Sequence, residues 1–231
     1  MTPEEFYREL STKISRVFAT HPQLTDHRTE HPGLVGALGD PFSGIWFVGV
    51  YPSQTRVDSL PKRTDFPLTA DEAQWSVSPG DKLLREMLVK HGFKSGTVES
   101  RGGWNCYLTD IIKQLVYAGA WNDKPQRERQ LIAETWYPVL RWELETSRPR
   151  LIVAMGKQAT RLLAYLKDTH ALKLPRIEEV ESYVYVASRP RGNQPPMDPQ
   201  RIQEYDDRFA RIARILRELC ASLTSFPGNM R

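Results

Sequence analysis

Cysteine and long apolar runs are both scarce in this chain. Its 231 residues include two cysteines, Cys106 and Cys220, and no Cys-x-x-Cys pair or Cys/His cluster at metal-ligand spacing. A disulfide scaffold and a structural zinc site are therefore excluded, and two free thiols in a reducing compartment are expected. No apolar run reaches the roughly 18 residues of a membrane span, and the N-terminus opens with acids instead of a basic leader. We expect a cytoplasmic protein with no bound metal and no membrane contact.

Phosphate-loop glycines are also missing, although one segment carries part of the pattern. Gly156-Lys157 follows an apolar run, but the glycine-rich spacing that should precede it is absent. Gly156 is therefore expected only to end a strand tightly.

The charge is basic but only modestly so. A net charge of +4 and a sequence pI near 9.1 are compatible with a nucleic-acid partner, and equally with an enzyme that has no such partner.

Hydrophobic periodicity and Gly/Pro punctuation predict helices that alternate with strands. Thr2 and Pro3 are typical of a helix start, and the run "GIWFVGV" at 44–50 is typical of a strand buried on both faces. Residues 51–78 are expected to form a long polar loop, and loops of that length are usually functional or mobile. The expected helices are residues 2–21, 78–93, 126–147, 157–168 and 200–223, with Leu131, Trp136, Leu140 and Leu144 on the apolar face of the third. The expected strands are residues 44–50, 105–110, 150–156 and 182–188.

This order predicts one α/β domain over residues 1–231, a three-layer α/β/α fold around a four-stranded, mostly parallel sheet. Residues 1–40 are the N-terminal helix and lead-in, 41–220 the core and 221–231 a tail. Ligands of such sheets bind beyond the carboxyl ends of the strands. The site is therefore expected in the loops that follow Val50, Leu108, Met155 and Ala187.

Four segments at these strand ends resemble the motifs of the uracil-DNA glycosylase superfamily. They are Gly49-x-x-Pro52 followed by a small residue, "YLTD" ending at Asp110, "RPRLIVAMGKQATRLL" and "SRPRGN". The resemblance spans about Ile45 to Leu216. It implies a hydrolase that flips a nucleotide out of DNA and cleaves the bond between base and deoxyribose through an oxocarbenium-like transition state. It implies no cofactor, and two cysteines cannot hold the four-cysteine iron-sulfur cluster that some branches carry.

Two departures from the superfamily pattern lie in the first motif. Tyr51 stands where familiar members have an Asp or Asn that orients the attacking water. A phenol is a poor general base but can hold a water by hydrogen bond, so Tyr51 is either catalytic or merely lines the pocket. Ser53 stands where the uracil-specific branch has a large aromatic, and a serine leaves room for a substituent at carbon 5 of a pyrimidine.

Asp110 is the sharpest departure, because the second motif normally ends in an Asn that pairs with uracil. An ionised Asp offers only acceptors, which suit the exocyclic amine of cytosine and repel the uracil carbonyl. A protonated Asp110 would instead donate to the cytosine ring nitrogen and help the base to leave. The alternative is a turn or helix cap ahead of "IIKQL".

The remaining expected site residues lie in loops or near the first motif. Arg189 replaces the histidine of the superfamily's His-Pro-Ser motif and would stabilise an anionic base or grip a phosphate. Expected base-binding residues are Gly49, Ser53, Gln54, Trp75 and Asp110, with ordinary core packing as the alternative for Trp75. Expected DNA contacts are Arg56, Lys62, Arg63, Arg191, Asn193 and Met197, with Arg208, Arg211 and Arg214 of the last helix as further phosphate contacts.

Together these residues predict a monomeric DNA glycosylase for a cytosine-like base enlarged at carbon 5, as in hypermodified phage genomes. It is similar in this respect to superfamily enzymes of antiviral defence. Three alternatives stay open: a repair glycosylase for uracil or other deaminated bases, a non-catalytic binder of modified DNA, and a nucleoside hydrolase.

Overall fold

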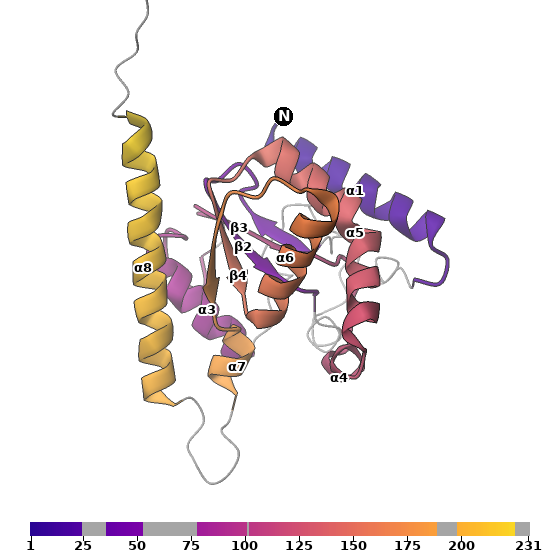
Figure 1. The fold of residues 1–231 in the computed structure, drawn as a ribbon. Helices are drawn as coiled ribbons and strands as arrows, with labels where there is room; N and C mark the ends of the chain where they lie inside the picture. The colour runs from indigo at the N-terminus through magenta and orange to yellow at the C-terminus, as the bar shows by residue number, and fades with distance from the viewer. Residues whose placement is uncertain (25–35, 53–77, 101, 189–197, 225–231) are drawn as a thin grey trace, which may run out of the picture.

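The computed structural model describes residues 1–24, 36–52, 78–100, 102–188 and 198–224 and shows a central five-stranded sheet (Figure 1). The strand order is β1-β3-β2-β4-β5. β2, β3, β4 and β5 run parallel, and β1 pairs antiparallel with β3 at one edge. The strands are β1 (Ala37–Gly39), β2 (Ile45–Gly49), β3 (Tyr107–Asp110), β4 (Leu151–Met155) and β5 (Arg176–Val180).

Helices cover both faces of the sheet, so the predicted three-layer α/β/α fold is confirmed (Figure 1). One face packs against α1 (Pro3–Thr20), α4 (Ala118–Asn122), α5 (Gln126–Ser147) and α6 (Lys157–His170). The other packs against α3 (Pro79–Lys90), α7 (Tyr183–Ala187) and α8 (Pro199–Thr224).

β2 lies at the centre of the sheet and is buried along its whole length. Trp46 and Val48 point into the apolar cluster beneath α1, α5 and α6. Ile45 and Phe47 point into the cluster beneath α3 and α8, where the Phe47 ring stacks on Phe209 with centroids 5.5 Å apart. A strand with helices on both sides needs a continuous apolar run, which is why this strand could be predicted from sequence.

The predicted helix starts are confirmed where caps marked them. Thr2 and Glu5 form a capping box at α1, and the Ser78 side chain accepts from the Asp81 N–H at α3. These oxygens satisfy amide groups that a helix leaves unpaired at its first turn. The prediction for Leu131 was wrong, because this side chain of α5 is 52% exposed while Trp136, Leu140 and Leu144 are buried.

The strand predicted at 182–188 is also wrong: this segment contains the short helix α7, and residues 176–180 form the parallel strand beside β4. β5 is an edge strand, so its charged side chains stay partly exposed and find partners. Glu178 pairs with Arg176, and Glu179 accepts from Thr160 at 2.6 Å. Its sequence "RIEEV" therefore lacks an apolar pattern. β1, the fifth strand, has three residues and is too short to show periodicity.

Both cysteines are free thiols. Cys106 is buried, and burial raises the pKa of its thiol well above the ordinary value. Within the described ranges, no group of three His, Cys, Asp or Glu side chains is placed to hold a metal ion. Nor does any helix in that part of the chain have the length and apolar character to cross a membrane.

Candidate nucleotide-binding site at the carboxyl edge of the sheet

The parallel strands bring the predicted motifs to one edge of the sheet. β2 and β3 end in register, with Gly49 opposite Asp110, and β4 and β5 end with Met155 opposite Val180. Ligands of parallel α/β sheets bind at this edge. The structure therefore places Gly49 and Asp110, which are 61 positions apart in the sequence, side by side.

The Asp110 carboxylate occupies the space that a side chain at position 49 would fill. A Cβ atom on Gly49 would lie 2.2 Å from Oδ1 of Asp110 and 3.6 Å from Cε of Met155. Glycine at 49 therefore leaves the room that lets the carboxylate lie against its backbone. Asp110 itself is half-buried, and its backbone N–H donates to the Gly36 carbonyl at 3.1 Å.

Backbone hydrogen bonds continue the pairing of the two motifs past the ends of the strands. The N–H of Ile111 donates to the Gly49 carbonyl at 3.1 Å, and the N–H of Val116 donates to the Pro52 carbonyl at 3.2 Å. The chain that follows Asp110 is thus held along the Gly49–Pro52 segment.

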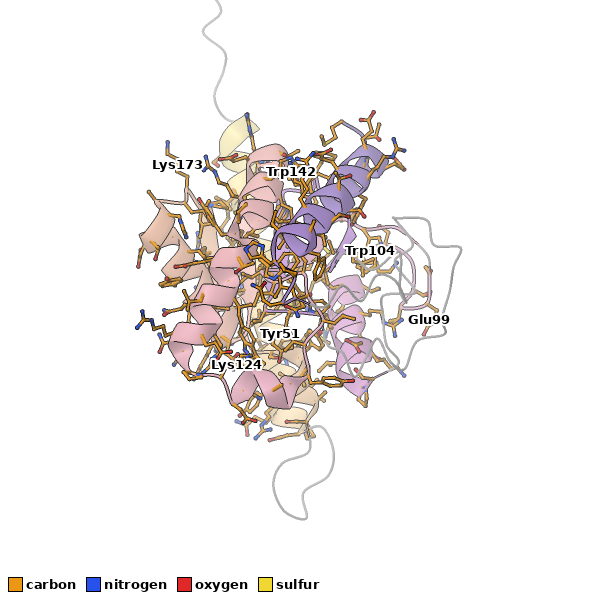
Figure 2. The ribbon with its side chains drawn as sticks, turned by 90° about the vertical axis from the view of Figure 1, so that its right-hand side faces the viewer. Tyr51, Glu99, Trp104, Lys124, Trp142 and Lys173 are labelled. Atoms are coloured by element: carbon orange, nitrogen blue, oxygen red, sulfur yellow. The ribbon has the colours of Figure 1, made fainter. Side chains whose placement is uncertain are left out.

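Tyr51 turns its ring towards α4 (Figure 2). The ring is half-buried and packs on Trp121 with centroids 5.1 Å apart and planes inclined by 53°. It joins the apolar cluster beneath α1, α5 and α6. Asp110 and Gly49 share the other face of the sheet with Met155. The structure therefore brings Asp110 to Gly49 and directs the Tyr51 ring to the opposite face.

Trp121, which sequence reasoning missed, anchors Tyr51 to two helices. Its indole is fully buried, and Nε1 donates to Oε1 of Gln158 in the first turn of α6 at 2.5 Å. Gln158 in turn donates from Nε2 to Oδ1 of Asn122 at 3.3 Å. α4 has only five residues, so no helical periodicity could have marked this tryptophan.

Gly156 ends β4 tightly, as predicted. Its φ of +95° lies in a region that glycine adopts without strain, and its N–H donates to the Val180 carbonyl at 2.7 Å. A Cβ atom there would lie 3.1 Å from Cβ of Ser182. The start of α6 and the segment leading into α7 therefore meet at this edge of the sheet.

Two predicted phosphate contacts on α8 are engaged with acids near β5. Nε of Arg208 lies 3.0 Å from Oε2 of Glu181, and Nη2 of Arg211 lies 3.4 Å from Oε2 of Glu178. Arg214 is exposed. These arginines follow β5 along one side of the sheet.

Several predicted site residues lie outside the described part of the chain. They are Ser53, Gln54, Arg56, Lys62, Arg63, Trp75, Arg189, Arg191, Asn193 and Met197.

The comparison with known families agrees with the fold and with the paired motifs. Residues 36–209, three quarters of the chain, match the Uracil DNA glycosylase superfamily. No curated protein matches the chain. The matched range begins just before β1 and ends within α8, so it includes all five strands and the Gly49–Asp110 pair. The chain therefore belongs to the uracil-DNA glycosylase superfamily.

Proposed function

We propose that this protein is a DNA glycosylase that excises a cytosine-like base, enlarged at carbon 5, and leaves an abasic site. Members of the superfamily are DNA glycosylases, and DNA is the partner on which the family acts. A stacked base hides its glycosidic bond, so the nucleotide must be flipped into a pocket before the bond is cut.

The position of the Asp110 carboxylate carries the choice of base. Its Oδ1 lies against Gly49 at the edge of the sheet where a flipped base would enter. An ionised carboxylate accepts hydrogen bonds, so it suits the amine of cytosine and repels the uracil carbonyl. The small side chain of Ser53 adds room for a group at carbon 5.

The reaction needs three further contributions. A positioned water must attack the sugar carbon, and negative charge on the leaving base must be stabilised. We assign the stabilisation to the guanidinium of Arg189. The Tyr51 ring packs on Trp121, away from the Asp110 carboxylate, so we leave the group that holds the water unassigned.

The exposed surface of α7 supports a DNA contact beside this site. Val184 and Tyr185 are 51% and 56% exposed, and the Arg201 guanidinium lies over the Tyr185 ring at 4.9 Å from its centroid. Aromatic rings paired with cations are used to stack bases and approach phosphates. α7 follows directly on the Ser182 segment at the strand ends, so a nucleotide flanking the flipped one would reach it.

The test is base release from DNA containing uracil, cytosine, 5-hydroxymethylcytosine or glucosylated 5-hydroxymethylcytosine. We expect release of the modified cytosine. Asp110→Asn should lower that release by about a hundredfold, in line with the loss of one positioned catalytic group, or shift it towards uracil. Asp168→Asn on the exposed side of α6 is the matched control and should release base at the wild-type rate.

The packing of Tyr51 on Trp121 favours one alternative, a protein that binds modified DNA without cutting it. A phenol engaged in packing is a weaker water-holding group than the usual carboxylate. Tight binding to modified DNA with no abasic product would establish that alternative. Release of uracil alone would point to a repair enzyme, and release from free nucleosides to a nucleoside hydrolase.

A further inference from the structure

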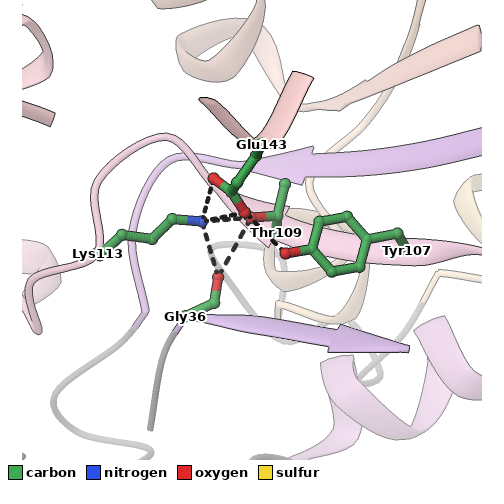
Figure 3. A network of polar contacts seen from close by, with 5 residues as sticks. All are labelled: Gly36, Tyr107, Thr109, Lys113 and Glu143. Atoms are coloured by element: carbon green, nitrogen blue, oxygen red, sulfur yellow. Dashed lines mark hydrogen bonds and ion pairs between the residues drawn. The ribbon is translucent and has the colours of Figure 1, made fainter. Parts of the chain in front are cut away.

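A fully buried ion pair joins Lys113 to Glu143 next to β3 (Figure 3). The side chains of Lys113 and Glu143 have no exposed surface, and Nζ of Lys113 lies 2.9 Å from Oε2 and 3.1 Å from Oε1 of Glu143. Lys113 follows β3, and Glu143 lies on the inner face of α5. The pair therefore joins the loop after β3 to the helix that covers it.

Two side chains of β3 complete the network. Tyr107 and Thr109 donate from their hydroxyls to Oε1 of Glu143 at 2.7 and 2.9 Å, and Lys113 also donates to the Thr109 hydroxyl. Burial, followed by the charge of Glu143, raises the pKa of Tyr107 well above its ordinary value. Tyr107 thus stays protonated and acts as a donor.

Such a buried network is not expected to make the folded protein much more stable than apolar side chains would. Removing two charges from water costs several kcal/mol per ion, and apolar residues of similar size often stabilise a protein equally well. A network of this kind does, however, allow only a narrow set of backbone positions, because every member must keep its partners.

The network includes the Gly36 carbonyl (Figure 3), and this carbonyl also binds the backbone N–H of Asp110. This oxygen accepts from the Asp110 N–H at 3.1 Å and from Nζ of Lys113 at 3.4 Å. The Thr109 hydroxyl, which donates to Glu143, lies 3.5 Å from it. Thr109 directly precedes Asp110 and Lys113 follows it by three positions. The network therefore holds the backbone on both sides of Asp110.

We propose that Lys113 and Glu143 are positioning residues that fix the backbone of Asp110, and so hold its carboxylate against Gly49 for reading the base. This inference rests on the proposed function of Asp110. Neither residue touches the base. They act through the backbone of Asp110.

The test is the double variant Lys113→Met/Glu143→Gln, which removes both charges and keeps an acceptor for Tyr107 and Thr109. We expect kcat for base release to fall about tenfold or more with KM for DNA unchanged, since small displacements of a positioned group cost this much. In the Asp110→Asn background the same double change should cause no further loss. The surface pair Lys124→Met/Glu128→Gln is the matched control, because its members are also paired but lie on the outer surface.

Hydrogen exchange gives a readout that does not depend on activity. In the double variant, the amide hydrogens of Asp110 and Ile111 should exchange at least about tenfold faster than in the wild type, while those of β4 should not change to match. Amide exchange measures local opening, so it is faster only where the network no longer holds the backbone. If the wild-type protein releases no base, the proposed function is overturned. Hydrogen exchange at Asp110 and Ile111 then decides by itself whether Lys113 and Glu143 position the Asp110 backbone. Unchanged exchange, or faster exchange with unchanged kcat in an active enzyme, would overturn the inference.

A second variant keeps the test decisive if the double variant does not fold. Thr109→Val removes one hydroxyl with little change in shape. It should raise exchange at Asp110 and lower kcat by a smaller factor than the double change. Wild-type exchange and wild-type kcat in this variant would overturn the inference.

Discussion

The Asp110 side chain can lie where it does only because residue 49 is a glycine and has no Cβ atom. Asp110 Oδ1 lies only 2.2 Å from the point where a Cβ on Gly49 would be. The backbone of Gly49 does not lie in the left-handed region, so alanine at this position meets no backbone strain. It meets only the carboxylate, which is the end of a side chain and can rotate away.

We therefore expect Gly49→Ala to separate activity from stability. The carboxylate should turn away from its place, lowering base release by about tenfold or more, while the free energy of unfolding changes by no more than about 1 kcal/mol. Release assays and urea denaturation measure the two effects. Gly119→Ala is the control, because a Cβ there would meet nothing within 4 Å. Unchanged release by Gly49→Ala would contradict the role given to this contact.

At the scale of elements, α7 shows why an alternating pattern can mislead. "SYVYVAS" alternates apolar and polar residues like a half-buried strand, yet of the five residues of α7 only Val186 is buried. The place beside β4 is taken by β5, which gains its pairing from backbone hydrogen bonds along Leu151–Met155. Val184 and Tyr185 of α7 thus remain exposed at the surface beside the site.

Tyr185→Ala tests whether this surface binds DNA. Because stacking on an aromatic ring contributes about 1–3 kcal/mol per base, affinity for single-stranded DNA should fall about fivefold or more. Fluorescence anisotropy with a labelled oligonucleotide measures this, and Leu131→Ala, equally exposed on α5, is the control. An equal affinity of Tyr185→Ala and the wild type would remove α7 from the DNA-binding surface.

At the scale of the whole molecule, α8 packs beside α3 on one face of the sheet and forms ion pairs with the C-terminal end of α3. Its Tyr205 and Phe209 are fully buried against the sheet side, and Asp206 between them lies 2.6 Å from Nζ of Lys90 and 2.7 Å from Nε2 of His91. Partial burial by itself would raise the pKa of Asp206, but the hydrogen bonds and charges of Lys90 and His91 outweigh burial and lower it.

This lowered pKa predicts how stability depends on pH. A carboxyl group whose pKa is lower in the folded state stabilises the fold above its unfolded value, about 3.9, and this contribution is lost as the pH falls through the folded pKa. Asp206→Asn should therefore lower the free energy of unfolding near pH 6 and match the wild type more closely below about pH 3. Urea denaturation across this range measures the difference. A constant difference at all pH values would show that the ion pairs are not its source.

The sequence by itself determined the class of fold and most of its elements. Helix caps such as Thr2 and Ser78 and buried runs such as Ile45–Gly49 and Leu151–Met155 are local signals, because each reflects hydrogen bonding or burial within a few residues. The order of motifs also placed Gly49 and Asp110 at the ends of their strands. Both expectations followed from short stretches of chain.

Only the tertiary structure decided which strand borders β4 and how the site residues face one another. The charged side chains of β5 find partners far away in the chain, in Thr160 and Arg211, and β1 forms where β3 offers it an edge. Tyr51 turns to Trp121, and Asp110 is held by a Lys113–Glu143 pair that unites β3 with α5. Such contacts join residues far apart in the chain, and their energies depend on burial and geometry that no local pattern records.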